Sequence, residues 1–237
     1  MDKQKTYFNW STGKDSALAL HYLLQNKNYS IEHLLTSINA HHDRVSMHGL
    51  RRELLLQQIN ALCIPNSTIE LPEQPSMLEY EDLMKEAVTR LQEKGFECAG
   101  FGDIFLEDLK QYREQQLAPF NIKTVFPLWK RDTMALLYEF IDFGFKAVLV
   151  CINSDLLDIS FVGRTIDKDF INDLPSGVDP CGENGEFHTF CFDGPIFKYP
   201  IPYIIGEKTY REYKAPTDTS STQKSDIGFW FCDLLPG

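Results

Sequence analysis

The sequence lacks several features that would assign it at once to a class of proteins. Its six cysteines, at positions 63, 98, 151, 181, 191 and 232, include no C-x-x-C pair. No run approaches the ~18 apolar residues that a membrane-spanning helix needs. The apolar stretch before Ser11 is short, so no signal peptide is expected. We therefore expect free thiols rather than disulfide bonds, and a cytoplasmic location.

An excess of basic residues is also missing. The chain has 23 basic and 34 acidic residues, which gives a formal net charge of -11. A protein that coats nucleic acid needs a basic surface, so nucleic acid is not an expected partner, although Lys130 and Arg131 form a local basic pair. With 237 residues, 43% of them hydrophobic, the chain is long enough for one large domain or two small ones.

Strand-like segments alternate with segments of helical period in the first half of the chain. The strand-like runs are residues 7–10, 31–38, the neighbours of Ile69, 98–101 and 124–126, and the helical segments are 15–25, 50–62, 78–91 and 105–117. This alternation implies right-handed crossovers and a parallel sheet with helices on both faces. The sequence therefore predicts an α/β fold whose ligands bind beyond the carboxyl ends of the strands.

The pattern changes after residue 126. A helical segment over 133–143 and an apolar strand over 147–152 precede a stretch rich in glycine and proline that reaches Pro195. We place a domain boundary near Leu128, which divides the chain into residues 1–128 and a smaller, mixed α+β domain over 129–237. Residues 215–226 are expected to form a mobile loop, and residues 227–232 a last strand.

The segment Ser11-Thr12-Gly13-Lys14-Asp15-Ser16 lies between the first strand and the first helix. Such a turn presents backbone N–H groups at the positive end of the helix dipole, where anions bind. Gly13 allows close approach of the backbone, the hydroxyls of Ser11 and Ser16 can donate to phosphate oxygens, and Lys14 adds a positive charge. The segment is therefore a candidate phosphate loop.

Three interpretations of this segment compete. The first is a simple helix cap. The second, a Walker loop, fails because it requires glycine where Phe8 stands and serine or threonine where Asp15 stands. The third is the S-G-G-x-D-S loop of ATP pyrophosphatases, the PP-loop, which departs from the chain at Thr12 alone. We favour the PP-loop, with Asp15 as a ligand of Mg²⁺ that bridges the phosphates; a first-turn acid that complements the helix dipole is the alternative for Asp15.

Further segments narrow the substrate class, and each is specific mainly in combination with the others. They are Met47-His48-Gly49-Leu50-Arg51, Gly102-Asp103-Ile104, Glu107-Asp108, Tyr112-Arg113-Glu114, Phe126-Pro127-Leu128-Trp129, Gly163-Arg164 with Asp167, and Asp179-Pro180-Cys181-Gly182-Glu183-Asn184-Gly185-Glu186-Phe187-His188-Thr189-Phe190. From about Tyr7 to Phe197 the chain resembles the diphthine–ammonia ligase family of PP-loop ATPases.

The resemblance implies a HUP-like (Rossmann-like) nucleotide-binding domain, of the adenine nucleotide α-hydrolase type, and a C-terminal domain that closes a substrate pocket. It implies a ligase that uses ATP and Mg²⁺, activates a carboxylate as an acyl-adenylate, releases pyrophosphate and forms an amide with ammonia. One departure is His188, because the eukaryotic and archaeal ligases have E-G-G-E-(F/Y)-E-T in this segment. The variant is similar to a bacterial branch, so we expect the chemistry to carry over and the substrate to differ.

The resemblance and the residue types together suggest a catalytic set. Asp103 follows the fourth strand, where it is expected either to face the reacting groups or to cap the next helix. Glu183 and Glu186 are expected to orient or deprotonate the attacking amine, and His188 to act near neutral pH. The alternative for these three residues is a solvated surface hairpin. Cys181, within the same segment, is the cysteine of most interest.

The nucleotide pocket is expected to include Met47, His48 and Gly102, with Arg51 either on a phosphate or in an ion pair on the helix surface. His41 and His42 suggest a metal site, but no further Cys or His stands at ligand spacing, so a solvated loop is favoured.

Two other functions remain as alternatives. One is a tRNA-modifying PP-loop enzyme, which the acidic charge and the lack of paired cysteines disfavour. The other is a nucleotide-binding sensor, which would not require the carboxylates of the C-terminal segment. A homo-oligomer is left open.

Overall fold

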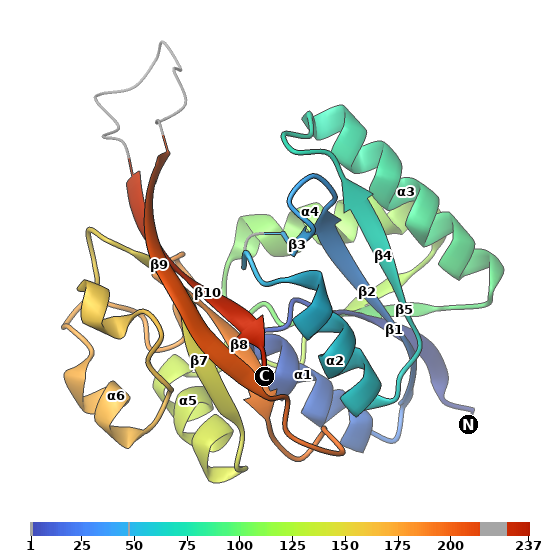
Figure 1. Ribbon diagram of the computed structural model, residues 1–237. Helices are drawn as coiled ribbons and strands as arrows, with labels where there is room; N and C mark the ends of the chain where they lie inside the picture. Colours follow the sequence, from blue (N-terminus) through green and yellow to red (C-terminus); the bar gives the residue numbers. More distant parts are fainter. Residues whose placement is uncertain (1, 47, 214–226) are drawn as a thin grey trace.

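The computed structural model describes residues 2–46, 48–213 and 227–237 and contains two β-sheets (Figure 1). The first sheet comprises β1 (Gln4–Asn9), β2 (Tyr29–Asn39), β3 (Arg44–Val45), β4 (Asn66–Leu71), β5 (Cys98–Gly100) and β6 (Lys123–Val125). Its main strands pair in parallel in the order β4-β2-β1-β5-β6, and β3 joins β2 in antiparallel orientation. The predicted parallel sheet is therefore confirmed.

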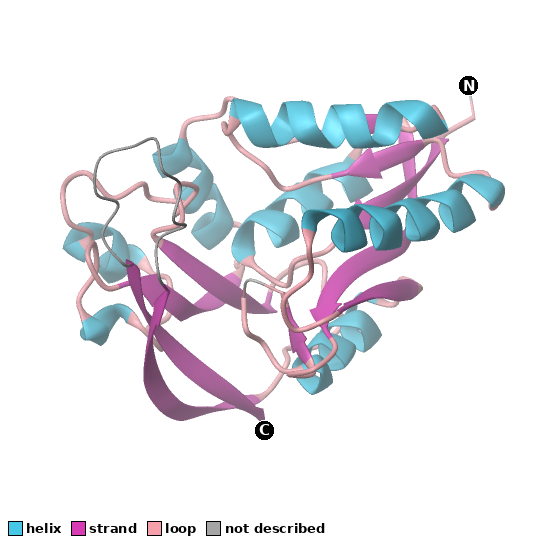
Figure 2. Ribbon diagram, turned by 90° about the horizontal axis from the view of Figure 1, so that it is seen from above, coloured by secondary structure: helices cyan, strands magenta, loops and turns pink. Residues whose placement is uncertain are grey.

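Helices cover both faces of this sheet, as Figure 2 shows from above. They are α1 (Lys14–Gln25), α2 (Arg52–Leu62), α3 (Met77–Glu93) and α4 (Glu107–Leu117), which continues into the 3₁₀ turn η1 (Ala118–Phe120). Neighbouring residues of β1 point to opposite faces: Phe8 packs in a cluster with α1 and α2, and Tyr7 in a cluster with α3. The predicted sandwich of helices around a Rossmann-like sheet is thus present.

The second sheet is antiparallel, with the order β8-β7-β10-β9. Its strands are β7 (Lys146–Asn153), β8 (Phe187–Asp193), β9 (Tyr203–Tyr213) and β10 (Ile227–Pro236), and it is accompanied by α5 (Thr133–Asp142), α6 (Lys168–Asp173) and the 3₁₀ turn η2 (Ile159–Phe161). The helix, the apolar strand and the final strand predicted for this half are confirmed, whereas β8, β9 and α6 were not predicted. The expected loop over 215–226 lies outside the described residues.

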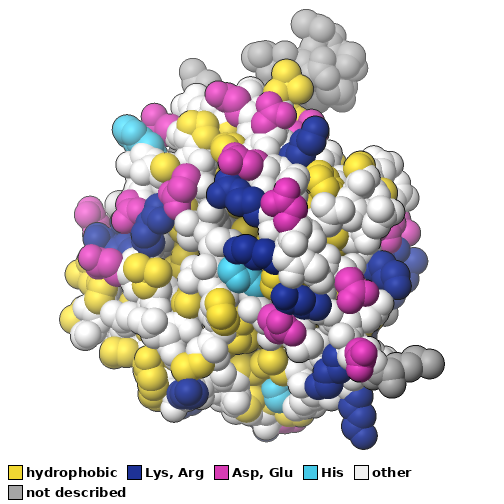
Figure 3. Space-filling view, turned by 90° about the vertical axis from the view of Figure 1, so that its right-hand side faces the viewer, with side chains coloured by type: hydrophobic (Ala, Val, Ile, Leu, Met, Phe, Trp, Pro, Cys, Tyr) yellow, Lys and Arg dark blue, Asp and Glu magenta, His cyan; other side chains and the backbone are white. Residues whose placement is uncertain are grey.

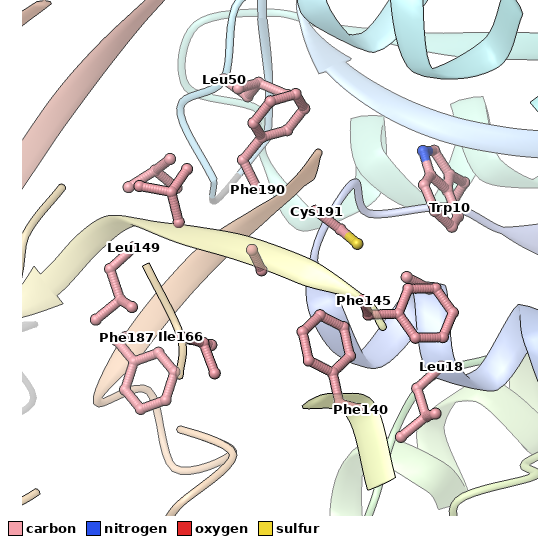
Figure 4. Close-up of a cluster of buried hydrophobic side chains, with 14 of the residues drawn as sticks. Trp10, Leu18, Leu50, Phe140, Phe145, Leu149, Ile166, Phe187, Phe190 and Cys191 are labelled. Atoms are coloured by element: carbon pink, nitrogen blue, oxygen red, sulfur yellow. The ribbon is translucent and has the colours of Figure 1, made fainter. Parts of the chain in front are cut away.

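One hydrophobic cluster runs through both halves of the chain. Trp10 and Leu18, from the first half, pack in the same cluster as Phe145 and Phe190, from the second (Figure 4). Leu128, at the proposed boundary, is itself fully buried in this cluster. The division at residue 128 therefore stays a prediction.

The surface charges and the state of the cysteines agree with the expectations from the sequence. Acidic and basic side chains are interspersed on the face drawn in Figure 3, without a broad field of one sign. All six cysteines are free, as predicted, and five of them are buried. In the part of the chain that the structure describes, no helix has both the length and the apolar character needed to cross a membrane.

Candidate functional site

The phosphate loop joins β1 to α1, beyond the carboxyl end of β1. Helix α1 begins at Lys14, its N-cap is Gly13, and no side chain caps it, so the simple-cap interpretation is wrong. The hydroxyl oxygens of Ser11 and Ser16 lie 2.7 Å apart. Within the described residues, the N–H groups of Asp15 and Ser16 in the first turn donate to no backbone carbonyl. Free amides at a helix N-terminus suit the binding of phosphate.

Thr12 holds a backbone conformation that favours glycine. Its φ is 76°, in the left-handed region, and its side chain is fully buried with a hydroxyl that has no hydrogen-bond partner among the described residues. The carbonyl oxygen of Thr12 accepts from the amide of Cys191 at 2.9 Å and from Nε2 of Gln58 at 3.1 Å. The PP-loop pattern has glycine at this position, and glycine adopts a left-handed backbone without strain. Thr12 adopts it under strain.

Lys14 connects the loop to the C-terminal half instead of projecting freely. Its side chain is 3% exposed, and its Nζ donates to Asp15 at 2.7 Å and to the carbonyl oxygen of Cys181. Burial alone would lower the pKa of Lys14, but the neighbouring Asp15 carboxylate raises it above the ordinary lysine value. The backbone amide of Lys14 donates to Oγ1 of Thr189 on β8 at 3.0 Å. The lysine is therefore a fixed charge at the junction of the two halves.

Two glycines are required because other groups approach the loop closely. A Cβ atom on Gly13 would lie 2.8 Å from Cε1 of His48 and 3.2 Å from the carbonyl oxygen of Thr189. A Cβ atom on Gly102 would lie 3.0 Å from the amide nitrogen of Ser16. The segment after β5 thus packs directly on the first turn of α1. Both lie at the carboxyl edge of the sheet, where ligands of such folds bind.

Asp103 lies beside the loop and is paired with Arg113 of α4. Oδ1 of Asp103 accepts from Nη2 of Arg113 at 3.0 Å, and Oδ2 lies 2.9 Å from Nε. Helix α4 begins at Glu107 with Leu106 as its N-cap, so the expectation that Asp103 caps this helix is wrong. Arg113 belongs to a segment quoted for the family resemblance, but its pairing with Asp103 was not foreseen.

Glu183 reaches the same edge from the C-terminal half. Its Oε1 accepts from the backbone amide of Ile104 at 2.7 Å, and its own amide donates to Asp179 at 3.0 Å. Burial, assisted by the charges of Asp15 and Asp103, raises the pKa of Glu183 to about 7. A carboxyl group with this pKa can exchange a proton near neutral pH.

Glu186 has a different environment from the one expected of a base. It is 2% exposed, and its oxygens accept from the amide of Asp179 at 3.1 Å, from the amide of Asn184 at 2.9 Å and from Nδ2 of Asn184 at 3.0 Å. These bonds shape the turn that carries Glu183. The contacts therefore favour Glu186 as a positioning residue, and its role as a base stays a prediction.

His48 and His188 form a pair over the loop. Their ring centroids are 4.8 Å apart, and Nδ1 of His48 lies 3.0 Å from the carbonyl oxygen of Thr189. Burial lowers the pKa of His48 to about 3 and that of His188 to about 4, and the charge of Lys14 acts in the same direction. Both rings are therefore neutral at pH 7. The sequence suggested that His188 titrates near neutral pH, but its burial lowers its pKa well below that range. Met47 lies outside the described residues.

Arg51 is held by Asp233 of β10. Nη2 of Arg51 lies 2.6 Å from one carboxylate oxygen of Asp233, and Nη1 of Arg44 lies 2.9 Å from the other. Of the two alternatives for Arg51, this geometry favours an ion pair, although the partner comes from the second sheet and not from its own helix. A contact between Arg51 and a phosphate stays a prediction.

A shallow hollow that is open to solvent lies between β1, α3 and α4. Its wall includes Tyr7, Tyr80, Tyr112, Phe101 and Arg113, the partner of Asp103. The N-terminal half builds this hollow, whereas the sequence suggested an acceptor pocket in the C-terminal domain. An acceptor pocket in the C-terminal domain stays a prediction.

The structure thus brings most of the predicted site together. The loop, Gly102, Asp103, Glu183, His48 and His188 meet at one edge of the first sheet. Gln58 and Thr189 were missed: Gln58 is fully buried on α2 and carried no signal in the sequence, whereas Thr189 stood in a quoted segment and could have been assigned if β8 had been recognised.

Family models match both halves of the chain. Residues 4–118 match the diphthamide synthase N-terminal domain, and residues 132–220 match the diphthamide synthase C-terminal domain. Together the two matches cover the phosphate loop and the segment that carries Glu183.

Curated relatives are named diphthine–ammonia ligase. The protein from Danio rerio is 32% identical over 129 residues, which are 52% of this chain and 50% of the relative. The protein from Homo sapiens is 30% identical over 129 residues, 52% of this chain and 48% of the relative. The chain therefore spans about half the length of these relatives. A solved structure, a predicted subunit of tRNA methyltransferase from Methanocaldococcus jannaschii, is 16% identical with a TM-score of 0.43, over 62% of this chain and 80% of that one.

Proposed function

The chain belongs to the diphthamide synthase family, and on that premise we propose that it is an ATP-dependent ligase. In the proposed reaction it adenylates a carboxylate, releases pyrophosphate and transfers the acyl group to ammonia to form an amide. The activity is a proposal because the chain spans about half the length of the curated relatives that it matches. The observation that carries it is the position of Glu183, a carboxyl group with a pKa of about 7, at the edge where the phosphate loop lies.

The phosphates of ATP are proposed to bind on the first turn of α1. The N–H groups of Asp15 and Ser16, which donate to no backbone carbonyl, can donate to phosphate oxygens, and the buried ammonium of Lys14 adds a positive field. The hydroxyls of Ser11 and Ser16, now 2.7 Å from each other, can turn towards the same oxygens. Because the loop has the pyrophosphatase pattern, the cleavage is proposed to fall between the α- and β-phosphates.

Mg²⁺ is proposed to accompany ATP, with Asp15 as its protein ligand. Asp15 is partly exposed, with 30% of its side chain accessible, and Lys14 already contacts both of its oxygens. Magnesium in nucleotide sites is commonly held by one or two carboxylates together with substrate phosphates, so a single carboxylate at the loop fits. The ion would supply positive charge on the phosphate oxygens.

Glu183 is proposed to take the proton from the attacking amine. The amide of Ile104 and the turn shaped by Glu186 fix its position, and its raised pKa means that the ionised form accepts a proton readily near pH 7. The neutral pair His48–His188 is proposed to border the nucleotide without adding charge. Asp103 and Arg113 are proposed to line the entry of the acceptor from the adjacent hollow.

The identity of the acceptor is proposed only as a carboxylate. His188 stands where the ligases have glutamate, which supports an acceptor other than diphthine, and membership of a bacterial branch stays a prediction. The alternatives of a tRNA-modifying enzyme and of a sensor are not favoured, since the net charge is -11 and a sensor has no use for a buried carboxyl group such as Glu183. The cytoplasmic location also stays a prediction.

The test is the release of pyrophosphate from ATP and Mg²⁺ in the presence of a panel of carboxylates, with and without ammonia. We expect AMP and pyrophosphate as products, in amounts that depend on one class of carboxylate. Ser16→Ala should weaken ATP binding by about tenfold, or ~1.4 kcal/mol. ADP and orthophosphate as the main products would contradict the proposal.

A further inference from the structure

His41, His42 and Glu73 gather three metal-ligating side chains away from the phosphate loop. His41 and His42 follow β2, and Glu73 follows β4, the strand that pairs with β2 in parallel. The carboxyl ends of parallel neighbours meet at one edge of a sheet, which brings Glu73 beside two histidines that precede it by about thirty positions. This third ligand was not visible in the sequence, because it is a carboxylate and lies far along the chain.

The spacing of the ligand atoms suits a small divalent ion. Oε1 of Glu73 lies 3.3 Å from Nε2 of His42 and 3.9 Å from Nε2 of His41, and one set of ligand atoms from the three residues lies within 4.8 Å of one another. A tetrahedral site with metal–ligand bonds of about 2.0–2.1 Å has neighbouring ligand atoms ~3.3–3.4 Å apart. One of the three distances already has this value, and a rotation of exposed His41 would shorten its distances to Glu73 and to His42.

Backbone contacts hold the two segments in this arrangement. Asn39 Nδ2 donates to the carbonyl oxygen of Glu73 at 3.1 Å, and Asn39 Oδ1 accepts from the amide of His42 at 3.1 Å. The amide of Ala40 donates to the carbonyl oxygen of Leu71 at 2.8 Å. The ligands are therefore set on two strand ends that are tied to each other, which lowers the entropy cost of binding an ion.

We propose that His41, His42 and Glu73 bind one divalent transition-metal ion of the zinc class. Two imidazoles and one carboxylate are a donor set that suits zinc, and the exposure of the three side chains leaves the fourth position to water. Along the chain, the segment that carries the two histidines continues through β3 to His48, which lies over the phosphate loop. A bound ion would therefore restrict the motion of the segment that leads to this loop. This site does not depend on the proposed ligase activity.

The test is titration of the chelator-treated full chain with Zn²⁺ by calorimetry, and with Co²⁺ by its visible spectrum. We expect one ion per chain and absorption bands typical of tetrahedral Co²⁺. His42→Ala and Glu73→Gln should each weaken Zn²⁺ binding by at least tenfold, whereas Glu93→Gln, an exposed carboxylate at the end of α3, should leave it unchanged. All three substitutions lie on the surface, and circular dichroism checks that each variant is folded.

Two results would overturn the proposal. One is the absence of saturable Zn²⁺ binding by the wild-type chain. The other is binding that His42→Ala and Glu73→Gln leave as strong as in the wild type, which would place the ion on other groups, such as the exposed thiol of Cys63.

Discussion

Oε1 of Glu183 lies 2.7 Å from the amide nitrogen of Ile104. A carboxyl group from the segment before β8 thus accepts a hydrogen bond from the loop that follows β5. These residues are 79 positions apart in the sequence. The bond brings a proton-exchanging group of the C-terminal half to the edge of the N-terminal sheet.

Replacement of Glu183 by glutamine should remove the proposed base. In the wild type, the rate of amide formation should rise as pH passes through about 7, because Glu183 accepts a proton only when it is ionised. Glu183→Gln should lower the rate by ~10²–10⁴-fold and abolish this rise. The control is Glu186→Gln, which should lower the melting temperature and leave the midpoint of the pH profile in place. A shifted midpoint in that control alone would make Glu186 the base.

The same pKa determines the direction of a stability change. Burial raises the pKa of Glu183 from 4.5 to about 7, so ionisation favours the unfolded chain. The contribution of Glu183 to the free energy of unfolding is fully present below pH 4.5 and is lost as pH rises through about 7. The melting temperature of Glu183→Gln, measured relative to the wild type, should therefore increase between these two pH values. A difference that stays constant with pH would mean that Glu183 has an ordinary pKa.

Parts of this site could be predicted from the sequence and others could not. The phosphate loop and Gly102 follow from local patterns, because a strand, a run of small residues and a helix are consecutive in the chain. The contact of Lys14 with Thr189 needs β8, whose residues lie in a turn-rich stretch and were not recognised as a strand. The pairing of Glu73 with His42 depends on the order of strands in the sheet, which the hydrophobic pattern does not determine.

Thr12→Gly should stabilise the protein. A non-glycine residue held at a φ of 76° stores strain of order 1–3 kcal/mol, and glycine loses about 0.5–1 kcal/mol more in entropy on folding. We expect a net gain of about 1 kcal/mol in the free energy of unfolding, measured by urea denaturation. Thr12→Ala keeps the Cβ atom and should give little of this gain. An equal gain in both variants would assign the effect to the buried hydroxyl instead.

The pair Arg51–Asp233 should act through stability. Each of Arg51→Ala and Asp233→Ala should destabilise the chain, and Asp233→Ala should do so more because it also removes the ion pair with Arg44. The double variant should be little worse than Asp233→Ala. A coupling of about 0.5–1 kcal/mol is expected for a partly exposed pair. ATP affinity should stay unchanged in all three variants. A loss of affinity in Arg51→Ala but not in Asp233→Ala would place Arg51 on a phosphate.

His188→Glu should raise the pKa of His48. A carboxylate in place of a neutral ring, whose centroid lies 4.8 Å from that of His48, favours the imidazolium form. The pKa of His48, about 3 in the wild type, should rise by at least one unit in an NMR titration of its ring proton. His188→Gln supplies a neutral control and should leave the value low. If both variants behave alike, burial alone governs His48.

Gln58 is a fully buried side chain that accepts from Nε1 of Trp10 at 3.0 Å and donates to the carbonyl oxygens of Thr12 and Cys191. Trp10 directly precedes the phosphate loop, Thr12 belongs to the loop, and Cys191 belongs to the second sheet. Separation of the halves would break the hydrogen bond from Gln58 to Cys191 and expose to water the hydrophobic cluster that both halves share, which is costly. Heat should therefore melt both sheets in a single cooperative transition, and the loop should lose its ligand-binding shape at the temperature at which the whole chain unfolds.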